Sequence, residues 1–259
     1  MMLKRVVVIG SGNVAESLAG AIAAVPELEL VQLYARNEER GRTVAAMAHT
    51  TWSNRPEALA EADIYLFAVS DRAVQPLAET LPIPLDAVVA HTAGAVSIEA
   101  LRRFPRRAIL YPFQGFSAGR KVDFRAVPLF LETADAGLMP TLEAFAACLS
   151  EHIYHADSER RAHIHLAGVF CNNFSNAMYG MAEEILQQVD LPFEVLKPLI
   201  RETAEKALAA PSPRTVQTGP ARRGDLATQQ KHLQLIRDDR QRTIYELISQ
   251  TIWETSKKI

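Results

Sequence analysis

Residues 6–22, VVVIGSGNVAESLAGAI, constrain the fold of this chain more than any other stretch. Four branched apolar residues followed by glycines predict a buried strand that ends in a tight turn, and the spacing from Val14 onwards predicts a helix. Similar apolar runs recur up to about residue 156, with amphipathic stretches between them. Such runs are typical of strands buried on both faces of a parallel sheet, so repeated βαβ units are predicted.

The predicted strands and helices alternate along this first part of the chain. Strands are predicted at residues 5–10, 28–35, 63–69, 86–91, 107–113, 127–132 and 152–156. Helices are predicted at residues 14–24, 38–48, 73–81 and 97–103. The last three strands are not each separated by a full helical pattern, which allows antiparallel additions at the edge of the sheet.

After Asp157 the strand-like pattern stops, and helical periodicity is found at residues 158–189, 193–209 and 225–257. Asp157 or Ser158 is the predicted N-cap of the first of these helices. The segment APSPRTVQTGPARRG contains prolines and glycines that forbid a continuous helix. The predicted fold class is therefore α/β, with a doubly wound Rossmann-type, mostly parallel sheet domain (residues 1–155) followed by an all-α domain (residues 156–259).

Composition restricts the classes of partner. A formal net charge of -2 provides no basic field for nucleic acid or an anionic membrane, so a small-molecule substrate is expected. The first apolar run is too short for a signal sequence or a bilayer span, which indicates a cytoplasmic protein. Cys148 and Cys171 lack CxxC spacing, which favours two buried thiols over a disulfide or a zinc site, and no metal site is predicted.

The glycine turn predicts a dinucleotide site. Gly10 permits the tight turn, Gly12 lets the backbone approach a pyrophosphate, and Ala15 stands where a third small residue packs the helix on the strand. The pyrophosphate is expected beside Ser11, on the free N–H groups of Asn13 and Val14. The motif by itself also fits any glycine-bearing turn from strand to helix, and its place inside βαβ units favours the cofactor site.

The end of the second predicted strand favours NADP over NAD. An NAD-selective site usually has an acidic residue there to accept a hydrogen bond from the ribose 2′-hydroxyl. Here Arg36 and Asn37 take that place, and a guanidinium can bind a 2′-phosphate. The alternative is that Arg36 is a solvated loop residue.

Two later strand ends are expected to line the same crevice, because ligands of such sheets lie beyond the carboxyl ends of the strands. Ser70 can bind ribose or cap the next helix. His91 is a candidate acid or base, or a structural histidine. The residues predicted to contact the cofactor at these two ends are Val69, Ser70, His91, Thr92, Ala93 and Gly94.

Four segments carry a family resemblance: HTAGAVSIEAL, YPFQGFS, HLAGVFCNNF and TGPARRGDLATQQKHL. In this order they resemble the bacterial family that joins a Rossmann-like domain to a C-terminal helical domain designated as of unknown function. That family is related to the 6-phosphogluconate dehydrogenase and pyrroline-5-carboxylate reductase group, and its members are described as NADP oxidoreductases with no agreed substrate. The resemblance implies a catalytic cleft between the domains and a homodimer formed through the helical domain.

The resemblance also implies catalytic residues, namely His165, Asn173, Arg223 and Asp225. On an α-helix, His165 and Asn172 share one face, and Asn173 lies about 80° from His165. His165 is the candidate for proton transfer, or a histidine packed at a domain boundary. Arg223 suits a carboxylate or phosphate of the substrate. Asp225 can equally be the N-cap of the next helix.

One departure from the better-known relatives limits the reaction. Where the β-hydroxyacid dehydrogenases of this group have a catalytic lysine, this chain has Val169. Imine reduction, as in the pyrroline-5-carboxylate reductases, needs no such lysine. Two functions are therefore considered: an NADP-dependent oxidoreductase acting on a small, anionic carbonyl or imine compound, and a catalytically inactive NADP-binding sensor or scaffold, which Val169 favours slightly.

Overall fold

The structure is a computed structural model that describes residues 3–257. It divides into two compact units, Met1–Asn172 and Asn173–Ile259. This division lies C-terminal to the boundary predicted at residues 155 and 156. The difference arises because helix α5 (Ser158–Gly168) is anchored to the first unit through Arg161, which is completely buried.

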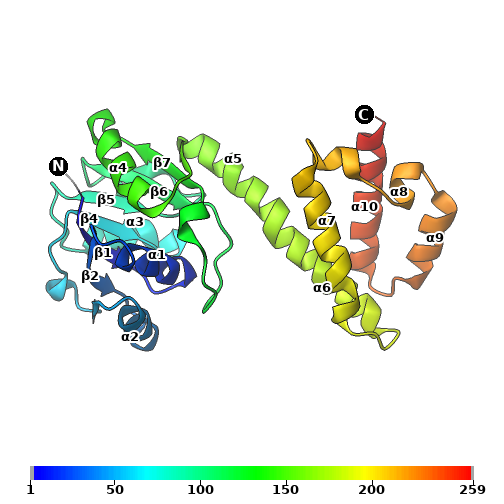
Figure 1. Ribbon diagram of the computed structural model, residues 1–259, viewed down its shortest axis with the longest axis horizontal. Coiled ribbons are helices and arrows are strands. Elements are labelled where there is room, and N and C mark those ends of the chain that lie inside the picture. The colour runs from blue at the N-terminus through cyan, green and yellow to red at the C-terminus, as the bar shows by residue number, and fades with distance from the viewer. Residues whose placement is uncertain (1–2, 258–259) are drawn as a thin grey trace. The chain divides into compact units, whose positions relative to one another are not determined.

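The first unit contains an eight-stranded sheet with the order β3-β2-β1-β4-β5-β6-β7-β8 (Figure 1). Strands β1 to β6 run parallel, β7 is antiparallel to β6, and β8 is parallel to β7. The predicted α/β class and the antiparallel addition are confirmed. The strand order reverses between β1 and β4, where a crevice opens at the carboxyl ends of the strands. The strands are β1 (Arg5–Ile9), β2 (Glu29–Tyr34), β3 (Thr51–Ser53), β4 (Ile64–Phe67), β5 (Val88–His91), β6 (Arg107–Pro112), β7 (Leu129–Thr133) and β8 (Ile153–His155).

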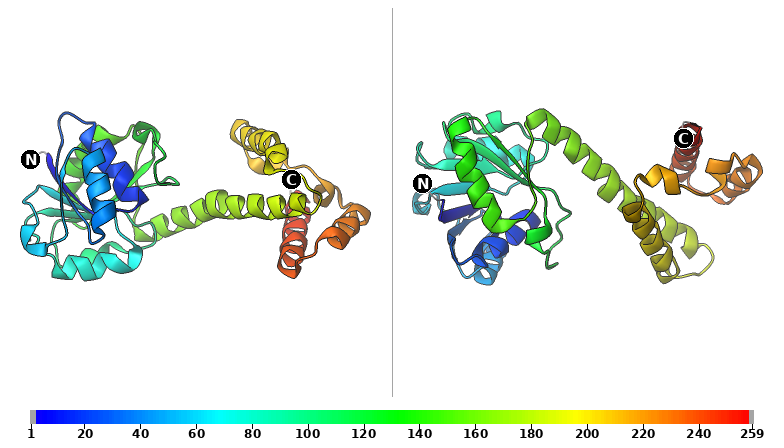
Figure 2. Two further views of the ribbon diagram at one scale, coloured as in Figure 1. Left: turned by 90° about the horizontal axis from the view of Figure 1, so that it is seen from below. Right: turned by 45° about the horizontal axis from the view of Figure 1, so that its top comes forward.

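Helices cover both faces of this sheet (Figure 2). Val6 and Val8 of β1 pack in one core with helices α1, α2 and α4, whereas Val7 and Ile9 pack in a second core with α3. Alternate residues of one strand thus enter opposite layers, which is why residues 6–9 of β1 are all apolar. The helices are α1 (Asn13–Ala23), α2 (Glu38–Met47), α3 (Asp71–Thr80) and α4 (Met139–Leu149), with 3-10 turns η1 (Pro56–Ala58), η2 (Ile98–Leu101), η3 (Phe124–Ala126) and η4 (Ala136–Leu138).

Three local predictions for the first unit were wrong. The helix predicted at residues 97–103 is only the 3-10 turn η2, which Ser97 caps by accepting a hydrogen bond from the Glu99 N–H. Strand β3 was missed because it is three residues long, and α4 was missed between two predicted strands. Both cysteines were also predicted to be buried thiols. They are free thiols, but Cys148 is half-buried and Cys171 is exposed.

The second unit is helical, as predicted, but its helices are interrupted (Figure 1). The helix predicted over 158–189 changes after Gly168 into a π-helical segment, and the one predicted over 225–257 is broken at residues 236–238. The elements that follow α5 are η5 (Val169–Phe174), α6 (Ser175–Gln187), η6 (Phe193–Leu196), α7 (Lys197–Ala209), η7 (Pro213–Val216), α8 (Pro220–Arg223), α9 (Leu226–Leu235) and α10 (Asp239–Ser256). Across residues 3–257, none of the helices combines the length and apolar character needed to cross a bilayer.

Candidate functional site

A cavity of about 730 Å³ opens at the carboxyl ends of β1, β2 and β4. The predicted cofactor residues that line it are Gly10, Ser11, Gly12, Asn13, Val14, Arg36, Asn37, Val69 and Ser70. The lining also includes Ile9, Tyr34, Ala35, Ala68, Ala73, Leu77, Gln114 and Phe116, which the sequence analysis did not single out. A volume of this size is typical of small-molecule and cofactor sites.

The glycine turn has the geometry that a bound dinucleotide requires. Gly10 has φ +128°, and a Cβ atom there would lie 2.1 Å from the carbonyl oxygen of Ala68. Gly12 has nothing within 4 Å of its hypothetical Cβ, which would project into open space at the cavity wall. Ala15 is fully buried in the core between α1 and the sheet, as a packing residue should be.

The start of α1 provides donors for an anion. Its N-cap is Gly12, and no side chain caps the helix. The N–H groups of Asn13 and Val14 therefore remain available at the cavity wall, where the helix dipole also favours negative charge. The residues present fit a pyrophosphate.

Arg36 and Arg40 have different roles at the end of β2. Arg36 is exposed, lines the cavity and has no ion pair or hydrogen bond from its side chain within the described residues. Arg40 instead pairs with Glu16 and donates from Nε to the carbonyl of Ser11 at 3.2 Å. Asn37 caps α2, because its side-chain oxygen accepts from the N–H of Arg40 at 2.9 Å.

The loop after β6 is held against the glycine turn by two hydrogen bonds. Asn13 donates from Nδ2 to the carbonyl of Phe116 at 3.1 Å, and the N–H of Gly119 donates to Glu16 at 3.2 Å. Gln114 and Phe116 thereby reach the cavity. The only signal for them in the sequence was the segment YPFQGFS.

The polar side chains after β5 are used to shape their own loop. His91 is fully buried, with Nε2 3.3 Å from the carbonyl oxygen of Ser97 and Nδ1 accepting from the N–H of Ala93 at 3.2 Å. Burial lowers its pKa to about 4, so the ring stays neutral. Thr92 donates to the carbonyl of Phe67 at 3.3 Å. The predicted residues His91, Thr92, Ala93 and Gly94 are not among those that line the cavity.

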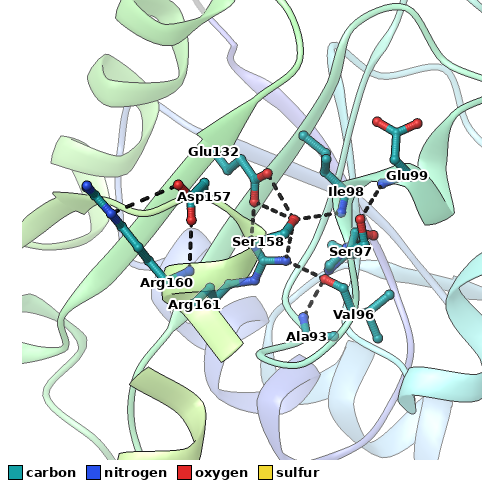
Figure 3. Close-up of polar contacts among 11 residues, drawn as sticks. Ala93, Val96, Ser97, Ile98, Glu99, Glu132, Asp157, Ser158, Arg160 and Arg161 are labelled. Carbon is teal, nitrogen blue, oxygen red and sulfur yellow. Dashed lines mark hydrogen bonds and ion pairs between the residues drawn. The ribbon is translucent and has the colours of Figure 1, made fainter. Parts of the chain in front are cut away.

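Helix α5 is fixed beside this loop by a buried ion pair (Figure 3). The guanidinium of Arg161 bonds the carboxylate of Glu132 on β7 and the carbonyl of Val96 in the loop. Ser158 donates to Glu132 at 2.9 Å and accepts from the N–H of Ile98 at 3.2 Å. Together these bonds join β7, the loop after β5 and the first turn of α5.

One face of the helix from α5 into the π-helical segment packs on the first unit. The Nδ1 atom of His165 lies 3.1 Å from the hydroxyl of Tyr111 on β6. A Cβ atom at Gly168 would lie 2.6 Å from the ring of Phe113, and one at Gly115 would lie 2.9 Å from Nδ2 of Asn172.

Of the two asparagines in the π-helical segment, Asn172 takes part in this packing. With α-helical spacing, His165 and Asn172 were expected to share a face, and the structure places His165 beside Gly94 and Asn172 beside Gly115. Asn173 is exposed and belongs to the second unit. π-helical segments often occur at functional sites. Tyr111 is the residue at this face that the sequence analysis missed.

In the second unit, the TGPARRGD segment forms a single helical turn. Gly219 (φ +103°) precedes α8 and Gly224 (φ +66°) ends it, conformations that favour glycine. Asp225 caps α9, accepting from the N–H of Thr228 at 3.0 Å and from its hydroxyl at 2.7 Å. The backbone hydrogen bond from Thr228 is the main cause of its lowered pKa. Arg223 has no hydrogen bond or ion pair from its side chain to another described residue.

Comparisons with known proteins agree with this two-part organisation. Residues 5–133 match the NAD-binding domain of semialdehyde dehydrogenase, and residues 127–252 match a domain of unknown function, DUF2520. The putative NADP oxidoreductase from Bacteroides fragilis is 37% identical, with a TM-score of 0.90 over 97% of this chain and 98% of that chain. The chain belongs to this DUF2520 family. It joins a Rossmann NAD(P)-binding domain to a DUF2520 helical domain, which confirms the resemblance inferred from the four sequence segments.

More distant structures share the fold with this DUF2520 family member. A 1-pyrroline-5-carboxylate reductase from Streptococcus pyogenes is 10% identical, with a TM-score of 0.65 over 98% of each chain. An imine reductase from Myxococcus stipitatus is 14% identical, with a TM-score of 0.61 over 100% of this chain and 95% of that chain. At such identities the similarity shows the fold alone. A comparison with proteins of curated function finds no match.

Proposed function

We propose that this protein is an NADP-dependent oxidoreductase that acts on a small, anionic carbonyl or imine compound. The nicotinamide cofactor would supply the hydride chemistry, while the chain binds, orients and moves protons. Support for the reaction class comes from the Rossmann cavity and from the 37% identical relative described as an NADP oxidoreductase.

The proposed preference for NADP over NAD rests on the position of Arg36. It lines the cavity at the end of β2 and no other described residue engages its guanidinium. The neighbouring Arg40 is already neutralised by Glu16, so Arg36 is the guanidinium available for a 2′-phosphate. None of the residues that line the cavity is acidic, so no carboxylate there repels that phosphate.

The proposed catalytic residues are His165 for proton transfer, with Asn173, Arg223 and Asp225 from the helical domain. Arg223 supports an anionic substrate, because its guanidinium can bind a carboxylate or phosphate in bidentate fashion. Asp225 would act by fixing the turn that carries Arg223, since its carboxylate is occupied as the N-cap of α9.

We also propose that the protein forms a homodimer through the helical domain. Of the apolar residues described in this unit, only Ala221 and Ile236 are buried, whereas Leu208 is 85% exposed and Leu226 and Leu235 are each 71% exposed. A helical domain needs a buried apolar face for stability, and a second copy of the chain can supply the same surface in return. Sedimentation equilibrium tests this proposal: a monomer at micromolar concentration would contradict it.

Cofactor titration tests the proposed function. NADPH fluorescence should show tight binding to the wild type and at least about ten-fold weaker binding of NADH. Arg36→Gln should weaken NADPH by about ten-fold or more and leave NADH unchanged, because only NADPH has the 2′-phosphate. Arg42→Gln is the matched control, since Arg42 pairs with Glu38 and lies outside the cavity lining. Equal affinity for both cofactors would contradict the NADP preference.

The alternative function, an inactive NADP-binding sensor or scaffold, is favoured by Val169, which cannot transfer a proton. A panel of cyclic imines and 2-oxo acids separates the two functions once NADPH binding is established. Turnover of NADPH with any of them supports the oxidoreductase. Tight NADPH binding supports the sensor if NADPH is turned over neither with any compound of the panel nor with a deazaflavin acceptor.

A further inference from the structure

Tyr111 and His165 form an isolated polar pair at the face between β6 and α5. The phenol hydroxyl lies 3.1 Å from Nδ1, and the two ring planes meet at 62° with their centroids 6.2 Å apart. Within residues 3–257, neither the hydroxyl nor the imidazole has a second hydrogen-bond partner. Tyr111 is buried and His165 is half-buried, so the hydrogen bond is made by the ring nitrogen of His165 that faces the protein interior.

The proton of this hydrogen bond belongs to the phenol. Burial raises the pKa of Tyr111 to about 12, so the hydroxyl is protonated at neutral pH. If Nδ1 carried a proton and donated it to the phenol oxygen, the phenol proton would itself be left without an acceptor. An unsatisfied buried donor costs about 1–3 kcal/mol, which favours donation from the phenol to Nδ1.

Steric contacts hold the imidazole in this orientation. A Cβ atom at Gly94 would lie 2.5 Å from Nδ1 of His165 and 2.9 Å from Cζ of Tyr111, so the loop after β5 closely approaches both rings. The loop is itself held to α5 by Arg161. The ring of His165 is therefore confined by a loop, a strand and its own helix.

We propose that Tyr111 is a positioning residue that fixes His165 in the tautomer with its proton on Nε2, and that Nε2–H is the donor to the carbonyl oxygen or imine nitrogen of the substrate. This inference rests on the proposed oxidoreductase function. A neutral imidazole can stabilise the negative charge that develops on that substrate atom. Before the reaction Tyr111 is a neutral phenol, so it orients the ring without placing a charge beside it.

The proton movements balance without a further reagent. The substrate oxygen or nitrogen forms a bond to the Nε2 proton, and the Nε2–H bond breaks. Nδ1 then takes the Tyr111 proton, so the imidazole stays neutral. Water then returns a proton to Nε2 and leaves as hydroxide, while the Nδ1 proton moves back to the phenolate, which restores the original tautomer. In the oxidation direction the same transfers run in reverse.

Histidine NMR tests this assignment without a substrate. In protein labelled with ¹⁵N-histidine, the long-range proton–nitrogen correlations of a neutral imidazole distinguish Nε2–H from Nδ1–H. We expect His165, assigned from its loss in His165→Gln, to be in the Nε2–H form. In Tyr111→Phe the signals should move towards a mixture of tautomers, because the donor to Nδ1 is gone.

A second histidine–tyrosine pair provides the matched control. His232 of α9 and Tyr245 of α10 lie with Nδ1 and the hydroxyl 2.9 Å apart in the second unit. Tyr245→Phe should change the His232 signals and leave those of His165 unaltered.

Two results would overturn the proposal: an Nδ1–H tautomer of His165 in the wild type, or unaltered His165 signals in Tyr111→Phe. The wild-type spectrum decides the tautomer even if Tyr111→Phe does not fold. NADPH titration separates this proposal from the proposed function: wild-type protein that binds no NADPH would refute the function, whereas the tautomer result stands independently.

Discussion

Gly94 and His165 are in contact so close that a Cβ atom at residue 94 would lie 2.5 Å from Nδ1 of the imidazole. The same atom would lie 2.9 Å from the ring of Tyr111. The close approach of this loop to the helix thus requires glycine at residue 94, which is not among the residues that line the cavity. The HTAG segment therefore joins the Rossmann sheet to the candidate proton donor.

Gly94→Ala tests this contact. The added methyl group should push His165 away from Tyr111 and lower the free energy of unfolding by about 1–3 kcal/mol, the usual range for overpacking. Urea denaturation measures the loss, and histidine NMR should show the same tautomer mixture as Tyr111→Phe. Unaltered His165 signals in a folded Gly94→Ala protein would show that the ring is not confined by this loop.

The two glycines of the first turn should respond differently to alanine. Gly10→Ala should destabilise the fold by at least about 2 kcal/mol, because it combines positive φ with overlap on the Ala68 carbonyl. Gly12→Ala should change stability by no more than about 1 kcal/mol, because nothing lies near its Cβ and only the N-cap preference for glycine over alanine is lost. Thermal unfolding without ligand distinguishes the two variants.

Gly12→Ala should nevertheless weaken NADPH binding by about ten-fold or more, because its methyl group occupies the space next to the expected pyrophosphate. Fluorescence titration of the folded variant gives the affinity. Wild-type affinity in Gly12→Ala would place the pyrophosphate away from this turn.

The buried ion pair of Arg161 and Glu132 should be sensitive to removal of one partner. Arg161→Met leaves a carboxylate without its partner in the interior, a change that typically costs about 3–5 kcal/mol. The double variant Arg161→Met/Glu132→Leu should recover part of this loss, since no buried charge remains. Urea denaturation of all three proteins measures these differences.

Arg160→Met is the control for the ion pair. Arg160 is the adjacent residue on α5, but its side chain is 77% exposed and its pairing with Asp157 at 4.0 Å is a surface contact. Its replacement should cost less than about 1 kcal/mol. A similar cost for both arginines would show that the buried pair does not anchor α5.

His91 should make the stability depend on pH. Burial lowers its pKa from 6.5 to about 4, so the unfolded chain binds the proton more readily than the folded one between these values. The free energy of unfolding should therefore fall as the pH is lowered from about 6.5 to 4, by up to about 3 kcal/mol from this residue. Above pH 6.5 the contribution is fully present.

Comparison of His91→Gln with wild type isolates this effect. The difference in unfolding free energy between the two proteins should shrink as the pH falls, because only the wild type loses the His91 contribution. His163→Gln, at an exposed position of α5, should keep the wild-type pH dependence. A constant difference from pH 4 to 7 would show that His91 does not titrate differently in the folded state.

Much of the fold of the first unit could be predicted from short-range patterns in the sequence. Branched apolar runs predicted seven of the eight strands, because burial on both faces leaves a signal in each residue of a strand. The glycine turn was equally readable, since Gly10 needs a conformation that few other residues adopt and Ala15 fills a fixed packing position. Strand β3 and η2 were misjudged because segments of three or four residues carry little periodicity.

Residues whose roles depend on distant partners could not be predicted in this way. Tyr111 reads as a strand residue, yet it meets His165, which lies 54 positions later in the chain. Arg161 reads as a surface residue of an amphipathic helix, yet it is fully buried because Glu132 and the Val96 carbonyl surround it. His91 was a candidate acid or base or a structural histidine, and its buried ring is hydrogen-bonded within its own loop, while Thr92 donates to the carbonyl of Phe67.

The sequence by itself thus determined the fold class and the glycine turn, because these depend on local conformation and on the pattern of burial, and it indicated the family through four segments that resemble it. Only the tertiary structure decided which polar groups meet. Arg36 faces the cavity while Arg40 is paired with Glu16, and His165 is held by Tyr111 and Gly94. Hydrogen bonds and close contacts depend on distances of a few ångströms between segments far apart in the chain, and those distances are fixed only when the sheet and helices pack.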